Sequence, residues 1–184
     1  MKTAEKTVDE IKSHILGAAF ARFGQFGWGK TTMAEIAKDC DMSAGNLYRY
    51  YENKAEIGAE CARLCFSQKE HLLREVLRRP NLTAGQRLEA FALETLRYMF
   101  DQFARQPRLF ELVTFISQER MELVERHLGV QRSLIAEILA EGNKTGEFDV
   151  RDILTVAETV QAATLKFNAP HFMTVFPLAQ LEAE

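Results

Sequence analysis

Apolar residues recur at helical spacing along nearly the whole chain of 184 residues. From Ile11 to Phe23, every fourth position is apolar, which predicts a first helix over about residues 8–23. No alternating strand pattern interrupts this spacing, so the predicted fold class is all-α. Similar stripes predict helices over about residues 54–78, 84–106, 109–117, 118–141 and 152–167, and Leu178 and Leu181 suit a short last helix.

Three helix starts follow one another closely between Thr31 and Lys54. In each, a capping residue is followed three positions later by a residue able to pair with it. Only residues 39–42 separate the first two helices, which predicts a helix-turn-helix, the unit that places its second helix in the major groove of DNA. The three pairs are Thr32 with Glu35, Ser43 with Asn46, and Asn53 with Glu56.

The second of these helices, expected over about residues 43–50, buries Leu47 and exposes polar and aromatic side chains. Amide, phenol and guanidinium groups suit the edges of bases and the phosphates of DNA. The exposed residues are Asn46, Tyr48, Arg49 and Tyr50.

The stretch TTMAEIAKDCDMSAGNLYRYYENKAEI resembles the DNA-binding signature of TetR-family transcriptional repressors, chiefly in T-x-x-x-I-A, S-x-G-x-L-Y-x-Y-Y and N-K. The resemblance is close over about the first third of the chain and architectural over the rest. It implies a helix-turn-helix domain over residues 1–53, followed by an antiparallel helical domain for effector binding and dimerisation over residues 54–184.

The same resemblance implies which residues contact DNA. The residues implied to contact base edges are Ala44, Gly45 and Asn46. Arg49 reaches either a base further along the groove or a phosphate. Ala44 offers only a methyl group, so it can make apolar contact alone. Asp41 stands where the turn often carries glycine, and aspartate tolerates the left-handed conformation that the turn needs. The implied phosphate contacts are Thr32, Tyr48, Tyr50 and Lys54.

The middle of the chain is rich in aromatic residues, which predicts a core. By the resemblance, it also holds a pocket for a hydrophobic or aromatic effector. The candidate pocket residues are Phe91, Tyr98, Met99, Phe103, Phe110 and Phe115. Small residues over 152–167 allow close helix approach and, with the resemblance, suggest half of a dimer-forming four-helix bundle. The candidate interface residues are Ile153, Ala157, Val160, Ala163 and Phe167.

Charge and cysteine content refine this expectation. The net charge is −3, with +1 up to Lys54 and −4 beyond it, so DNA binding must come from placed contacts and a paired subunit rather than from bulk charge. Three cysteines without a signal peptide indicate thiols in a cytoplasmic protein. No apolar run is long enough to span a membrane.

We expect no cofactor and no metal; the expected partners are double-stranded DNA with a palindromic operator, a small-molecule effector and a second copy of the chain.

Two other interpretations compete with a ligand-released repressor. Gly24–Thr31 fits the phosphate-binding pattern G-x-x-x-x-G-K-[ST], although that loop requires a preceding strand and the preceding residues continue a helical stripe. Cys61 and Cys65 share a helix face and would suit a thiol-based redox sensor. The chain shows no pairing of nucleophile and base, so we do not expect an enzyme.

Overall fold

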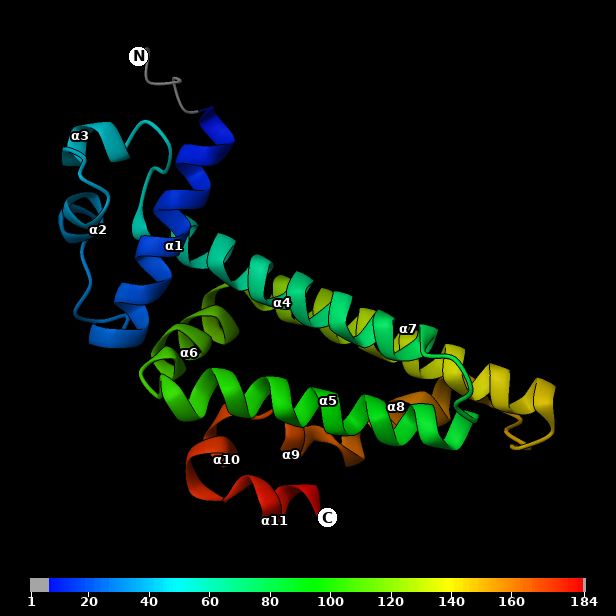
Figure 1. Ribbon diagram of the computed structural model, residues 1–184. Coiled ribbons are helices and arrows are strands. Elements are labelled where there is room, and N and C mark those ends of the chain that lie inside the picture. The colour runs from blue at the N-terminus through cyan, green and yellow to red at the C-terminus, as the bar shows by residue number, and fades with distance from the viewer. Residues whose placement is uncertain (1–6, 184) are drawn as a thin grey trace. The chain divides into compact units, whose positions relative to one another are not determined.

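The computed structural model describes residues 7–183, which are helical throughout apart from turns (Figure 1). The helices form two compact units. The first unit runs up to Leu64 and includes Arg108–Arg120, and the second comprises Cys65–Pro107 and the residues from Met121 onward. The helices are α1 (Val8–Phe26), α2 (Met33–Asp39), α3 (Ala44–Leu47), α4 (Lys54–Arg78), α5 (Ala84–Arg105), α6 (Leu109–Glu119), α7 (Met121–Thr145), α8 (Ile153–Ala163), α9 (Leu165–Asn168), α10 (Pro170–Val175) and α11 (Leu178–Glu182).

The compact units do not divide at residue 53. The first eleven residues of α4 belong to the first unit, and so does α6, which lies more than forty residues further along the chain. The functional division into residues 1–53 and 54–184 therefore stays a prediction about which part binds DNA. The compact unit that contains α2 and α3 is larger and discontinuous in sequence.

The predicted helix starts are confirmed. Thr32 and Glu35 form a reciprocal capping box, in which the Thr32 hydroxyl accepts from the Glu35 amide at 3.3 Å and the Glu35 carboxylate accepts from the Thr32 amide at 2.8 Å. The Ser43 hydroxyl accepts from the Asn46 amide at 3.2 Å. Because these side chains satisfy amide groups that have no partner within a helix, they fix where each short helix begins.

The second helix of the pair is shorter than expected. It was predicted over about residues 43–50, whereas α3 ends at Leu47. Beyond it, the Arg49 amide donates to the Asn46 carbonyl at 3.1 Å, and the Tyr50 amide donates to the Leu47 carbonyl at 3.0 Å. These bonds span three residues, so the chain tightens into consecutive turns. In the preceding turn, Asp41 has a φ of 55°, the left-handed conformation expected there.

The core of the second unit lies where α4, α5, α7 and α8 meet. Helix α7 packs against α5 and α8, and α9, α10 and α11 pack against α5. The core residues are Leu73, Ala84, Phe91, Leu134, Ile135, Ile138, Leu139 and Ala157. None of the described helices is both long and apolar enough to cross a membrane.

The helix predicted over residues 152–167 is interrupted at Thr164, where α8 gives way to α9. The Thr164 hydroxyl donates to the carbonyls of Val160 and Gln161, at 2.8 and 3.3 Å, and such side-chain bonds compete with the helical backbone pattern. Helix α9 ends at Asn168, and Pro170 occupies the first turn of α10, a position where its missing amide costs nothing.

The candidate dimer-interface residues separate into two groups. Ala157 is completely buried within its own unit, and Ile153 and Val160 pack against the same core, so they serve the packing of α8 on α7. Ala157 therefore has no surface to offer a second copy. Ala163 is exposed and Phe167 is half-buried, and for these two an interface role stays a prediction.

Two glycines of α7 provide a matched test of core packing. A Cβ atom added at Gly142 would overlap the Phe148 ring, whereas one added at Gly129 would meet nothing within 4 Å. We expect Gly142→Ala to lower the free energy of unfolding by about 1–3 kcal/mol through overpacking. Gly129→Ala should raise it by about 0.5–1 kcal/mol because alanine is the better helix former. Urea unfolding measures both, and equal effects at the two positions would contradict the packing described.

Candidate nucleic-acid interface

The residues predicted to read bases surround one buried anchor. Leu47 is completely buried and holds α3 against the first unit. On the opposite side, Gly45 and Arg49 are exposed and Tyr48 is 52% exposed. An added Cβ at Gly45 would meet nothing within 4 Å, so another molecule can approach the backbone closely there. The three remaining candidates, Ala44, Asn46 and Tyr50, are half-buried.

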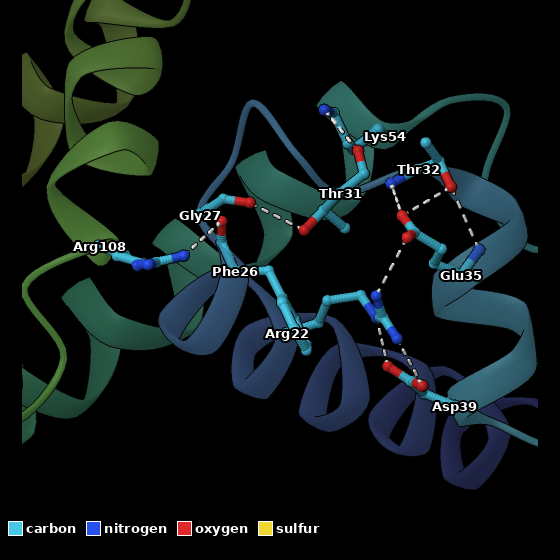
Figure 2. Close-up of polar contacts among 9 residues, drawn as sticks. All are labelled: Arg22, Phe26, Gly27, Thr31, Thr32, Glu35, Asp39, Lys54 and Arg108. Carbon is cyan, nitrogen blue, oxygen red and sulfur yellow. Dashed lines mark hydrogen bonds and ion pairs between the residues drawn. The ribbon is translucent and has the colours of Figure 1, made fainter.

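The position of α2 is fixed by Arg22 of α1. The Arg22 guanidinium donates to both carboxylate oxygens of Asp39, at 2.5 and 2.9 Å, and lies 3.4 Å from the Glu35 carboxylate (Figure 2). The hydrogen bond from Arg22 lowers the pKa of Asp39. Glu35 also accepts from the Thr32 hydroxyl at 2.9 Å. Thr32 is thus exposed but already hydrogen-bonded, and its predicted phosphate contact stays a prediction.

Lys54 points into the first unit. Its ammonium donates to the carbonyls of Trp28 and Thr31, both at 2.7 Å, and lies 4.5 Å from the centre of the Trp28 ring (Figure 2 shows the bond to Thr31). Burial lowers the pKa of Lys54, and the nearby Glu111 carboxylate partly offsets this effect. The ammonium therefore ties the start of α4 to the loop before α2. A phosphate contact would have to use its remaining N–H group.

Sequence reasoning missed the aromatic centre of the first unit. Trp28 lies 5.1 Å from the Phe23 ring and stacks on Phe115 of α6 at 4.3 Å. The Trp28 ring fits in this position because residue 58 is a glycine: a Cβ atom added at Gly58 would lie 2.6 Å from the indole ring. The pairing joins residues more than eighty positions apart, and local periodicity carries no signal for such a contact. Trp28 was visible only as the single tryptophan of the chain.

Helix α6 also makes polar contacts to the loop between α1 and α2. The Glu111 carboxylate accepts from the Gly29 amide at 2.9 Å. The Arg108 guanidinium donates to the Phe26 carbonyl at 3.3 Å, as Figure 2 shows. The Thr31 hydroxyl donates to the Gly27 carbonyl at 2.8 Å and closes the loop on itself.

These contacts argue against a nucleotide-binding loop at Gly24–Thr31. Gly24 lies inside α1, so a helix and not a strand precedes the loop. The Gly29 amide, which would have to face a phosphate, instead binds the protein's own carboxylate. The phosphate-binding pattern here is a turn between two helices.

The cysteines argue against a thiol-based sensor. Cys61 is 2% exposed, and burial raises the pKa of the half-buried Cys65 thiol to about 11. Because the thiolate is the reactive form, neither environment activates a cysteine. Within residues 7–183, no three metal-binding side chains gather into a cluster.

The candidate effector residues belong to two compact units. Phe91, Met99 and Phe103 are buried on α5 in the second unit, where the Tyr98 hydroxyl also donates to the Cys65 carbonyl at 3.0 Å. The two on α6 belong to the first unit. There, Phe110 is 46% exposed and Phe115 stacks on Trp28.

Two family models match the chain. The model of bacterial regulatory proteins of the tetR family matches residues 15–61, and the model of the tetracyclin repressor-like C-terminal domain matches residues 84–184. No curated protein sequence gives a significant match.

Solved structures share the fold at low sequence identity. A protein from Pseudomonas aeruginosa PAO1, proposed to be a transcriptional regulator, gives a TM-score of 0.73 at 16% identity, over 100% of this chain and 90% of that one. A proposed TetR-family regulator from Mesorhizobium loti MAFF303099 gives 0.73 at 18% identity, over 97% and 93%. The transcriptional regulator FadR from Bacillus subtilis, solved in complex with stearoyl-CoA, gives 0.65 at 18% identity over 93% of each chain.

Proposed function

Since the chain belongs to the TetR family of bacterial transcriptional regulators, we propose that it is a repressor that binds a palindromic operator as a dimer and is released by a small-molecule effector. The observation that carries the proposal is the accessible tip of the helix-turn-helix, where Gly45, Tyr48 and Arg49 are exposed around the buried Leu47. The protein acts by binding and not by catalysis.

In this proposal, the tip of α3 enters the major groove. The Asn46 side chain pairs with a base edge, and Arg49 reaches a base or a phosphate beyond it. Ala44 and Gly45 allow close approach, while Thr32, Tyr48, Tyr50 and Lys54 contact phosphates. Two copies related by a two-fold axis must place their α3 helices about 34–36 Å apart, or a multiple of it, to read successive major grooves.

The dimer uses the outward side of α8 and the residues that follow it. Leu154 is 69% exposed and Leu165 is 59% exposed, and Ala162 and Ala163 between them are exposed too. Large apolar side chains flanking small ones on a helix surface suit close packing against a second helix.

The effector acts through α4, a helix that is continuous from Lys54 in the first unit to Arg78 in the second. A ligand that prefers one position of this helix changes the spacing of the α3 pair and thus the affinity for the operator. We expect a hydrophobic or aromatic effector, and FadR from Bacillus subtilis, which shares the fold, was solved in complex with stearoyl-CoA, a ligand with a long apolar chain.

The experiment that tests the proposal is selection of bound fragments from the source genome, followed by anisotropy titration at two salt concentrations. A palindromic site preferred over scrambled DNA by about 10³-fold or more supports the proposal. Equal and steeply salt-dependent binding to both DNAs would show a generic phosphate contact and refute specific repression.

Asn46→Ala is expected to relax base preference at one position in each half-site, by about 1–3 kcal/mol of discrimination. Tyr48→Ala, the matched control on the same turn, should weaken binding to all sequences alike because it removes a phosphate contact. Both are measured by titrating a library of single-base operator variants. An unchanged preference in Asn46→Ala would remove its base-reading role.

A further inference from the structure

The second unit buries one lysine without a carboxylate partner. Lys69 of α4 is 3% exposed, and its ammonium donates to the side-chain oxygen of Asn168 at 2.5 Å. Among the described residues, this is its one hydrogen bond, and it forms no ion pair. An ammonium has three N–H groups and a full charge, so a buried one with a single neutral acceptor lacks the partners that normally accompany such burial.

The neighbouring carboxylate is already engaged. Glu70 accepts from the Nδ1 atom of His127 at 2.9 Å and lies 3.7 Å from the Arg74 guanidinium. His127 is 5% exposed and stacks on Phe66 at 4.3 Å. Its Nε2 atom lies 2.6 Å from the Gln131 amide nitrogen, so the neutral ring accepts from Gln131 and donates to Glu70. The Glu70 carboxylate is thus paired with His127 and Arg74, and not with Lys69.

A buried hydroxyl without a hydrogen-bond partner lies at the same level along the α4–α5 pair as Lys69. The Thr95 hydroxyl of α5 is buried and forms no hydrogen bond. The contacts of Tyr98 with Cys65 and of Arg87 with Leu77 show that α4 and α5 run antiparallel here. Lys69 lies one helical turn after Cys65 on α4, and Thr95 lies about one turn before Tyr98 on α5. Because the helices are antiparallel, these two displacements point the same way along the helix pair. An unsatisfied hydroxyl and an underpaired ammonium therefore occupy one layer of the interior.

We propose that Lys69 binds the carboxylate of an amphipathic effector, which takes the place of the Asn168 oxygen, and that the Thr95 hydroxyl donates to the same group. The apolar body of the effector lies along Met99 and Phe103, which share the face of α5 with Thr95 at intervals of four residues and are buried. This inference rests on the proposed function and names the chemical class of the effector for it.

The element that yields to the carboxylate is α9. It spans only Leu165–Asn168, between the interruption at Thr164 and Pro170, and a helix of this length has little stability of its own. The Asn168 side-chain oxygen accepts a hydrogen bond from the Lys69 ammonium, and a carboxylate is a stronger acceptor for that ammonium.

Isothermal titration of the full chain at pH 6.5 tests this proposal with n-alkanoates and phenylalkanoates of six to sixteen carbons, each beside its matched alcohol. We expect at least one carboxylate to bind about tenfold or more tightly than its alcohol, a difference of about 1.4 kcal/mol. Lys69→Met should abolish that preference and leave the alcohol's affinity within about twofold. The matched control is Lys144→Met on α7, whose side chain is 75% exposed and which should behave like wild type.

Equal binding of acids and alcohols, absence of any carboxylate binding, or a preference retained in Lys69→Met would each overturn the proposal. A second variant covers the case in which Lys69→Met does not fold. Asn168→Ala removes the competing acceptor and should tighten carboxylate binding about threefold or more, and weaker binding would contradict the exchange of partners. Operator titration without added ligand separates the carboxylate site from the proposed repressor function. Lys69→Met should bind the operator like the wild-type protein. A wild-type protein that binds no operator would refute repression, and the carboxylate titration of Lys69 would still test the carboxylate site.

Discussion

Replacing Trp28 by alanine is expected to remove about 3 kcal/mol of folding stability, and operator binding with it. The indole contacts Phe23 of α1 and Phe115 of α6, and it carries the Lys54 ammonium on its face. Truncation leaves a void between these elements, since the rings around it cannot collapse fully into the space. This loss is a large part of the 5–15 kcal/mol that a domain typically has, so the orientation of α3 should suffer too.

Urea unfolding and operator titration of the same samples measure the effect. Trp28→Phe keeps a ring in the site and should lose less than half as much. Phe26→Ala is the surface control, because Phe26 is 39% exposed at the end of α1, and it should change stability by no more than about 1 kcal/mol. A Trp28→Ala protein as stable as the Phe26→Ala protein would show that the indole does not hold the unit together.

Wild-type stability is expected to rise by about 2–3 kcal/mol between pH 7 and pH 9 relative to Lys69→Met. Burial lowers the pKa of Lys69 from its ordinary 10.5 to about 7. Between these two values the unfolded chain binds a proton that the folded chain does not, so raising the pH favours folding. Below pH 7 both states are protonated, and the full penalty of burying the charge is present.

The groups around Lys69 determine how the measurement is made. Burial, together with the nearby Lys69 charge, lowers the pKa of His127 to about 4, and the burial is present in both proteins, so this ring stays neutral across the window. Burial raises the pKa values of Cys65 and Tyr98, which reduces stability as the unfolded thiol and phenol ionise at high pH. Both proteins share these contributions, and the difference between their urea unfolding curves isolates Lys69. A constant difference from pH 7 to pH 9 would mean that the ammonium is not desolvated.

Local signals in the sequence predicted the helix-turn-helix well. Thr32, Ser43 and Asn53 each cap the helix that they were expected to begin. The left-handed turn at Asp41 followed from the conformational tolerance of aspartate. Such interactions join residues three or four positions apart, so their partners are visible in the sequence itself.

Contacts between distant segments were not predictable in the same way. Small residues on α8 suggested an interface, but Ala157 uses its size to pack on α7 of the same chain. Lys69 resembles the solvent-facing charges around it, although its spacing from Cys65 and Leu73 places it on the buried stripe of α4. That spacing was the one available signal of its burial.

The discontinuity of the first unit affects how the protein can be dissected. A fragment that stops at Leu64 would lack α6 and with it the Phe115 ring that covers Trp28 and the Glu111 carboxylate that binds the Gly29 amide. Such a fragment would present bare indole to water and be prone to self-association. No single cut releases the whole unit, so an isolated version requires residues 108–120 to be grafted back, for instance through a short linker after α4.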